Sequence, residues 1–401
     1  MENTPLSVTK SHGYFRPIRQ NIWQFFAFAP ARSVGLVFFS DSILFGTWVA
    51  HIPSVKAKYS LSDAHLGLLL FALPIGCFVM NPLTSRIVGR FGATQTCFGA
   101  ALSLSVAMLI PLNAPQIWMA AAGLLWVGLS AALLNVAMNT CATAVEHHSG
   151  TQIMSACHGM WSLGGMIGAA LASVVIILGV SPAHHVSIMC FGVAILTLFL
   201  RPIIQQIKEP PAPQTTTDGI VKPNFNLMLM IFVGLCVSMG EGLAFDWSAV
   251  YLKDIALASN QTAALGFATF AMAMTAARFA GDAIIPVIGQ HRLLFLGGLL
   301  AALGLVLAVV VPQPSVVLVG FVLLGFGCAL GAPILYAASM RVEGIAPAAG
   351  LATFATFSFV GFLAGPPLIG LVAEQFGLAQ GLLMVAVLLG ASSVVSRFVK
   401  L

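Results

Sequence analysis

Three carboxylates stand in stretches of the chain that are otherwise apolar, namely Asp41, Glu241 and Asp246. An ionised acid at the centre of a membrane-crossing helix costs about 2.5 to 3.5 kcal/mol on insertion scales, so it indicates a site that faces a cavity or a partner. Reversible proton carriers need buried carboxylates that can gain and lose a proton. The settings of Asp41, Glu241 and Asp246 therefore predict proton coupling.

Each acid also has a structural interpretation. Asp41 would be kept for packing if the hydroxyl of Ser40 or Ser42 satisfied it, and Asp246 would be a wetted helix end or a gate contact. Glu241 and Asp246 are five residues apart, about 140° on a regular helix, so they share a direction only if the helix is deformed. The glycines on both sides of Glu241 permit such a deformation.

A second set of side chains is suited to holding a small polar ligand in a mostly apolar pocket. Imidazole, indole and amide groups recur at helical spacings of three and four residues, which places them on shared helix faces. Hydrogen bonds between helices are the structural alternative, worth only about 0.6 to 2 kcal/mol each. The predicted substrate-binding residues are Trp48, Asn135, Asn139, His158, Trp161, Ser162, Trp247 and Tyr336.

The composition identifies the kind of protein that must position these groups. The chain of 401 residues is 59% hydrophobic and only 7% charged, whereas charged residues make up about 25% of soluble domains. We therefore expect an integral membrane protein. Its net charge of +5 is small and scattered, which argues against nucleic acid as a partner. The seven cysteines lack metal-ligand spacing, and no nucleotide-binding or hydrolase motif is present in the sequence. We therefore predict that the protein binds no metal or cofactor and is not an enzyme.

Twelve apolar segments are long enough to cross a bilayer as helices. Pro333 beside Tyr336 predicts a kink in the tenth of them, and glycines four residues apart, as at Gly164 and Gly168, predict close helix packing. The segments lie near residues 34–53, 66–84, 94–112, 117–139, 152–178, 186–204, 226–252, 262–285, 292–311, 315–338, 349–373 and 378–396.

The loop cations divide unequally between the two membrane sides. Lys56, Lys58 and Lys253 fall on one side and thirteen lysines and arginines on the other, which predicts that both termini are cytoplasmic. A polar, proline-rich stretch divides the chain in two. We expect a cytoplasmic N-terminal segment at 1–32, six-helix bundles at 33–204 and 225–401, and a cytoplasmic linker at 205–224.

The two bundles are also related in sequence. An ungapped shift of 199 residues places Trp48 on Trp247, Gly99 on Gly298 and Pro115 on Pro314. Parallel repeats of this kind are typical of transporters whose halves rock about a site near the bilayer midplane. The predicted fold class is therefore an all-α integral membrane protein with twelve transmembrane helices in two pseudo-symmetric six-helix bundles.

This organisation resembles the major facilitator superfamily over essentially the whole chain. Residues 85–92, Ser-Arg-Ile-Val-Gly-Arg-Phe-Gly, resemble the family's loop signature, with Gly89 in place of its usual aspartate. A weaker second copy runs from Arg278 to Asp282. We expect these two residues to form an ion pair at i, i+4 and favour this over a substrate-anion site at Arg278. The resemblance implies a cytoplasmic gate formed by Arg86, Arg90, Gly92, Arg278 and Asp282.

Three shorter segments are similar to a branch of uncharacterised bacterial inner-membrane transporters that includes a membrane protein from rhizopine loci. They are residues 48–53, 158–164 and 241–247. The resemblance implies a secondary transporter in the bacterial inner membrane that works by alternating access. We expect a monomer that couples protons to uptake of a polar sugar-like or cyclitol-like solute. Proton-antiport export is the alternative within this class, and a membrane receptor or intramembrane enzyme is the alternative outside it.

Overall fold

A computed structural model describes residues 25–149, 153–207, 221–345 and 347–401, and the regular structure in these ranges is helical. The helices form where the apolar segments lie, because a helix satisfies its own backbone polar groups in a lipid environment. Several begin at capping side chains. Ser62, Ser181, Asn224 and Ser259 each accept a hydrogen bond from the backbone N–H three residues later.

The first half of the chain forms helices α2 to α8. The short helix α3 and the turn after it connect α2 to α4, and Gly92, at φ +82°, forms the sharp turn between α4 and α5. The helices are α2 (Ala29–Ala50), α3 (Ile52–Lys58), α4 (Asp63–Phe91), α5 (Ala93–Asn113), α6 (Ile117–Ser149), α7 (Met154–Ile177) and α8 (Pro182–Ile204).

The second half forms helices α9 to α15. Gly289, at φ +87°, makes the turn that corresponds to Gly92, and the tenth expected span is split into two helices. The helices are α9 (Phe225–Asp254), α10 (Asn260–Ile288), α11 (Gln290–Val310), α12 (Pro314–Cys328), α13 (Gly331–Ser339), α14 (Pro347–Phe376) and α15 (Leu378–Val395).

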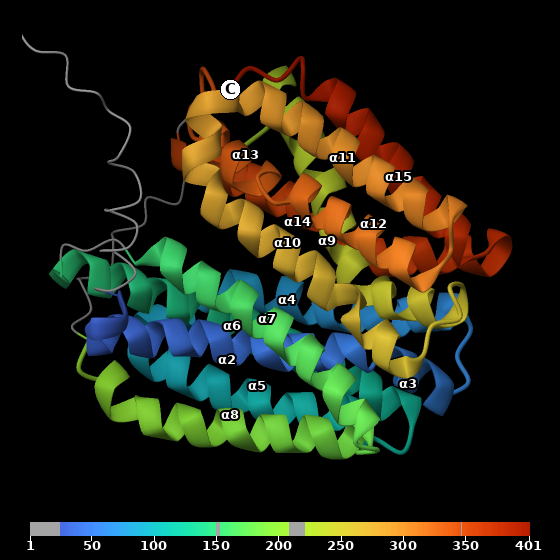
Figure 1. The fold of residues 1–401 in the computed structure, drawn as a ribbon. Coiled ribbons are helices and arrows are strands. Elements are labelled where there is room, and N and C mark those ends of the chain that lie inside the picture. The colour runs from blue at the N-terminus through green and yellow to red at the C-terminus, as the bar shows by residue number, and fades with distance from the viewer. Residues whose placement is uncertain (1–24, 150–152, 208–220, 346) are drawn as a thin grey trace, which may run out of the picture.

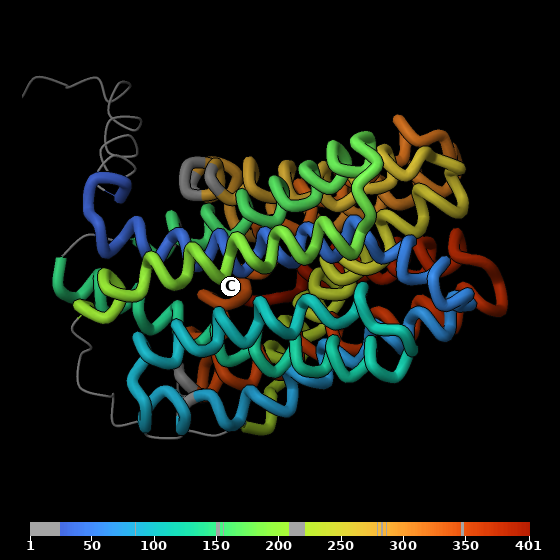
Figure 2. The backbone as a smooth tube through the Cα atoms, turned by 90° about the horizontal axis from the view of Figure 1, so that it is seen from below, coloured from blue at the N-terminus to red at the C-terminus, as the bar shows by residue number. Residues whose placement is uncertain are grey.

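The two halves lie side by side, with α2 to α8 below α9 to α15 in the view of Figure 1. The helices of both halves run along one common direction, as the second view shows (Figure 2). The C-terminus lies at the end of the molecule opposite α3 (Figure 1). We call these two ends the α3 end and the opposite end.

Eleven helices in the described part of the chain are long and apolar enough to cross a membrane. The remaining expected span, 262–285, corresponds to α10, a helix of 29 residues. The all-helical membrane fold predicted from the sequence is thus confirmed. The domain limits stay a prediction, since residues 1–24 and 208–220 lie outside the described ranges.

The halves touch each other at the α3 end. The side chain of Glu374 in α14 accepts a hydrogen bond from Ala64 N in α4 at 3.3 Å, and Ser173 Oγ in α7 donates to Gln261 O in α10 at 2.9 Å. Figure 1 shows the helices of the two halves diverging toward the opposite end. This is the arrangement of a two-bundle protein closed at one end.

Two pairs of neighbouring histidines lie outside the expected spans but within helices. His184 and His185 precede the expected span at 186–204 and occupy the first turn of α8, where Ser181 caps the helix. His185 is buried and its Nδ1 lies 2.9 Å from Nε2 of His51, which is also buried. The stretch Glu146 to His148 belongs to the last turns of α6, because that helix continues to Ser149.

Candidate functional site

Asp41 lies in the interior of α2 and is only 6% exposed. The indole Nε1 of Trp161, in α7, donates a hydrogen bond to its Oδ2 at 2.7 Å, whereas Oδ1 is buried without a hydrogen-bond partner among the described residues. The hydroxyls proposed as structural partners are engaged elsewhere: Ser40 donates to Leu36 O and Ser42 to Trp161 O. The carboxylate is therefore only half satisfied, by a residue from a neighbouring helix.

Glycines bring α2 and α7 close enough for this contact. A Cβ at Gly164 would collide with the backbone carbonyl of Phe39, and one at Gly168 with that of Ile43. The close packing predicted from this glycine pair is confirmed. Its consequence is that Trp161, three residues before Gly164, reaches the carboxylate of Asp41 with its ring nitrogen. Gly361 and Gly365 are a second pair of glycines four residues apart, in α14. A Cβ at Gly361 would collide with Leu235 O, whereas a Cβ at Gly365 would make only an ordinary van der Waals contact.

Glu241 occupies the matching place in the second half, on α9. Its Oε1 lies 3.6 Å from a terminal guanidinium nitrogen of Arg278 in α10, close enough for an ion pair and too far for a hydrogen bond. The side chains are 27% and 31% exposed, so both reach a space that is not filled by protein. The predicted partner of Arg278 was Asp282, whose side chain lies outside the described set, so that pair stays a prediction. Among the described residues Arg278 faces Glu241.

The split between α12 and α13 holds Arg278 in place. Pro333 has no N–H with which to bond the carbonyl four residues earlier, that of Ala329. The helix is interrupted at Ala329 and Leu330, and Nε of Arg278 donates to Ala329 O at 3.4 Å. The kink predicted from Pro333 is thus present, and it supplies an acceptor that an unbroken helix would not offer.

The other predicted ligand residues are distributed over both halves. His158 is exposed, stacks edge-on against Phe38 and lies within electrostatic range of Arg278 across the halves. Tyr336 is 40% exposed, packs against Phe354 and lies within the same range of Glu241. His158 near Arg278 and Tyr336 near Glu241, together with the Glu241–Arg278 pair, bring α7, α9, α10 and α13 together.

The asparagines and Ser162 have no such partners across the halves. Asn139 Nδ2 donates to Asn135 O, one turn earlier in its own helix, at 2.7 Å. Asn135 is exposed and Ser162 is 5% exposed. Their part in ligand binding stays a prediction.

Trp48 and Trp247 are completely packed in this conformation. They are 1% and 0% exposed, and both indole nitrogens are buried without a hydrogen-bond partner. Asp246, next to Trp247, is 6% exposed and has no hydrogen bond or ion pair to the described residues. Trp48 and Trp247 are therefore packed inside the protein in this conformation, and their contact with a ligand remains a prediction.

An aromatic layer separates Asp41 and Glu241 from the α3 end. Phe45 of α2 lies 5.8 Å from Phe245 of α9, ring centre to ring centre, and so joins the halves. Phe267 and Phe362 surround Phe245 at 5.4 and 6.1 Å. Asp41 and Glu241 each precede their layer phenylalanine by four residues, one helical turn. Asp41 and Glu241 therefore lie on the side of this layer that faces away from the α3 end.

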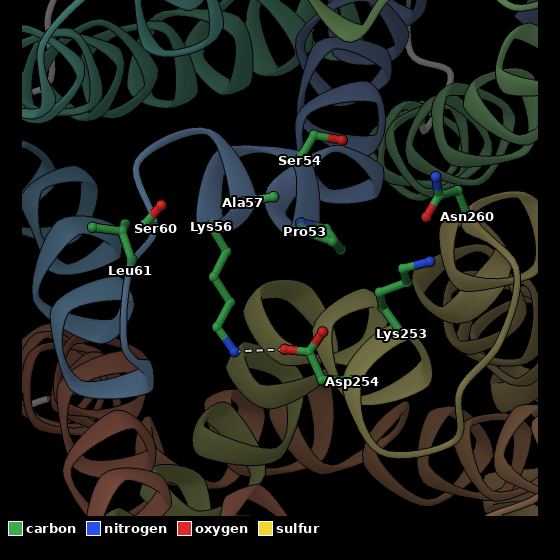
Figure 3. A pocket seen from close by; sticks show the side chains of 9 residues that line it. All are labelled: Pro53, Ser54, Lys56, Ala57, Ser60, Leu61, Lys253, Asp254 and Asn260. Carbon is green, nitrogen blue, oxygen red and sulfur yellow. Dashed lines mark hydrogen bonds and ion pairs between the residues drawn. The ribbon is translucent and has the colours of Figure 1, made fainter.

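Beyond this layer, Lys56 ties the halves together. Its Nζ lies 2.6 Å from Asp63 of its own half and 2.5 Å from Asp254 at the end of α9 (Figure 3). Burial alone would lower the pKa of Lys56, but the hydrogen bonds and charges of the two carboxylates raise this pKa above its ordinary 10.5. Lys56 and Asp254 line a surface cavity of about 540 Å³, which contains no acid of the central site.

The remaining predicted gate residues lie near the opposite end. Arg86 and Arg90 are exposed in the last turns of α4, and Gly92 follows at the turn. Neither arginine makes an ion pair among the described residues. Their role in closing this end stays a prediction.

Sequence comparison places these features in context. Residues 33–342 match the sequence model of the Major Facilitator Superfamily. An uncharacterised MFS-type transporter of Yersinia pestis is 33% identical over 361 residues, covering 89% of this chain and 92% of the relative. The membrane protein MosC of Rhizobium meliloti is 28% identical, with 88% and 86% covered.

Solved structures agree with the fold. A variant of the nucleoside transporter NupG superposes with a TM-score of 0.72 at 15% identity, covering 91% of this chain and 97% of that protein. The fucose:proton symporter FucP of E. coli gives 0.61 at 14% identity, covering 92% and 98%. Identities this low establish the architecture of the chain and nothing about its ligand.

Proposed function

Because the chain belongs to the major facilitator superfamily, and is thus a multi-pass membrane transporter and not an enzyme, we propose that it couples proton movement to uptake of a polar sugar-like or cyclitol-like solute. The observation that carries the proposal is the pair of acids, one in each half. Asp41 is held by Trp161 and Glu241 by Arg278, and one aromatic layer lies next to both. Protonation would weaken each contact and so change how its half packs.

The polarity of the space supports a small hydroxylated solute. His158 and Tyr336 offer hydrogen bonds from opposite halves, and Trp161 offers a ring of the kind that packs against sugar faces. Fucose is the named solute of FucP and nucleosides are that of NupG, both of them polar and hydroxylated. For the present chain, the polar side chains named above are what support the same solute class.

Topology follows from the same assignment. We place the α3 end outside and the opposite end in the cytoplasm of a bacterial inner membrane. The described cations near the opposite end include Arg86, Arg201, Arg292 and Arg397, whereas the α3 end has Lys56, Lys58 and Lys253. In this orientation the structure corresponds to an inward-facing state.

The test uses purified protein in liposomes with labelled myo-inositol, L-fucose and D-glucose. We expect one of these solutes to accumulate against its gradient when a pH gradient is imposed, and to alkalinise the outside as it enters. Asp41→Asn and Glu241→Gln should abolish accumulation, whereas exchange of labelled for unlabelled solute should partly survive, because exchange requires rocking without net proton movement.

The control is Glu343→Gln, which neutralises an exposed acid outside the helices. It should accumulate solute like the parent. Proton coupling through the pair is wrong if both single variants also accumulate solute at the parental rate. Movement of solute outward on an imposed pH gradient would support the antiport alternative instead.

A further inference from the structure

Arg278 lies farther from a helix end than any other described lysine or arginine. It lies ten residues from the end of α10 at Ile288, whereas every other described lysine or arginine is within five residues of a helix end or outside a helix. A cation at membrane depth is costly, so it is retained where it meets a partner or a ligand. Glu241 is the ion-pair partner at hand, but this pair is loose.

The guanidinium group has more donors than acceptors around it. Arginine carries five N–H donors, and of these only Nε makes a hydrogen bond, to Ala329 O, among the described residues. One terminal nitrogen has Glu241 at 3.6 Å, and neither terminal nitrogen makes a hydrogen bond to a described residue. With Nε anchored at the split helix and 31% of the side chain exposed, the fork of terminal N–H groups is held ready for a planar acceptor.

Protonation of Glu241 would leave this cation without a compensating charge among the described side chains. The imidazole of His158 from α7 and the thiol of Cys328 from α12 face Arg278, and the phenol of Tyr336 from α13 faces Glu241. None of these is an ordinary anion at neutral pH. An unpaired buried charge is strongly unfavourable, so the site in that state requires an anion from elsewhere.

We propose that the transported solute carries a carboxylate, and that Arg278 binds it while Glu241 is protonated. The inference rests on the proposed function, because it takes Glu241 as a proton carrier. One cation matches one negative charge, whereas a phosphate dianion would remain half uncompensated beside two acids. With hydroxyl-binding groups at His158 and Tyr336, the chemistry fits a sugar acid. Its single negative charge and the proton on Glu241 cross together, so these two charges cancel in the transport cycle.

The test is thermal stabilisation of the full-length protein in detergent by matched pairs of probes. The pairs are D-glucuronate with D-glucose, D-galacturonate with D-galactose, and D-gluconate with D-glucitol, with inorganic phosphate added as a separate anion. We expect at least one carboxylate to stabilise the protein at lower concentration than its neutral partner and phosphate. Arg278→Gln should weaken that binding by about tenfold to a hundredfold, the loss of a charge-assisted hydrogen-bond pair.

Two further variants separate binding from folding. Glu241→Gln removes the competing acid, so carboxylate binding should be at least as tight as in the parent and should lose its dependence on pH between about 5 and 8. The double variant Arg278→Gln/Glu241→Gln leaves no unpaired charge, so it should fold and yet bind no carboxylate. Arg292→Gln, which changes an exposed arginine at the start of α11, is the matched control and should bind like the parent.

The inference is overturned if no carboxylate binds more tightly than its neutral partner, or if binding survives in Arg278→Gln. It is also overturned if phosphate is the best ligand. Such results leave the proposed function intact when a neutral sugar still accumulates in liposomes and Glu241→Gln abolishes that accumulation. Conversely, carboxylate uptake that depends on Arg278 but persists at full accumulation in Glu241→Gln would refute proton coupling at Glu241 and keep the carboxylate site.

Discussion

Replacement of Gly67 by alanine should open the α3 end of the transporter. Gly67 in α4 packs directly on α14, so that a Cβ there would lie 2.5 Å from the carbonyl oxygen of Pro366. A Cβ at Gly370 would likewise lie 2.6 Å from Asp63 O. Backbone oxygens cannot rotate out of the way. The two helices must therefore separate, and with them the two halves.

The expected size follows from the kind of clash. Overpacking of a close contact costs about 1 to 3 kcal/mol. Because α4 and α14 belong to different halves, this cost falls on the state in which the halves meet at the α3 end. The equilibrium should shift toward the separated state by about 5-fold to 150-fold. The helix propensity gained by replacing glycine with alanine, about 0.5 to 1 kcal/mol, is the same in both states and cancels.

The assay is a distance measurement between spin labels on cysteines at Gln116 and Gln313, with the native cysteines replaced. Both positions are exposed in turns at the α3 end, one in each half. Gly67→Ala should transfer population from the short to the long distance. Gly99→Ala is the control for the substitution, because no atom lies within 4 Å of its Cβ position.

Gly128→Ala is the control for a clash of the same kind within one half. Its Cβ would collide with the carbonyl of Leu73, so it should lower the unfolding temperature without changing the label distances. The reasoning fails if Gly67→Ala gives the distance distribution of Gly99→Ala. An unchanged distance distribution would mean that α4 and α14 keep the same contact throughout the transport cycle.

Two other contacts yield predictions of their own. Trp161→Phe removes the hydrogen bond to Asp41 and should lower the stability of the protein by about 1.5 to 3 kcal/mol, measured as thermal unfolding. If Trp161→Phe causes no such loss in an Asp41→Asn background, the hydrogen bond to the charged carboxylate is the cause of the loss. An unchanged unfolding temperature in Trp161→Phe would contradict the contact. Lys56→Gln removes the cross-half ion pair, worth about 1 kcal/mol at this exposure, and should shift the label distances about fivefold toward opening. Lys253→Gln, whose lysine makes no ion pair among the described residues, should not do so. Because the pKa of Lys56 is raised above 10.5, its contribution is complete at lower pH and is lost only as pH rises through the raised value, so the difference between Lys56→Gln and the parent should be constant from about pH 6 to 9.

Much of the architecture could be predicted because it depends on local pattern. Apolar runs mark the helices, and the glycines of α7 and the proline of α13 act within one or two turns of where they stand. The acids could be selected for the same reason, since Asp41 and Glu241 are conspicuous wherever the helices are placed. These signals need no knowledge of which helices are neighbours.

The partners of the acids could not be predicted in this way. Trp161 meets Asp41 across 120 residues of sequence and Arg278 meets Glu241 across helices, and helical spacing alone reveals neither contact. Lys56 and Asp254 are likewise distant in sequence. One signal was available: Pro333 frees the carbonyl of Ala329, and a buried acceptor of this kind requires a donor from a neighbouring helix.

The aromatic layer of Phe45, Phe245, Phe267 and Phe362 also determines where an electric field acts. A membrane voltage falls mainly across dry, weakly polarisable material, and in this state that material is the layer and the closed α3 end. Glu241 and Arg278, reached from the opposite end, then lie close to the electrical potential of that compartment. Proton binding at Glu241 should hardly respond to voltage. A voltage of 100 mV, worth about 2.3 kcal/mol per elementary charge, would instead act on the rearrangement that moves the insulating layer from one side of the acids to the other.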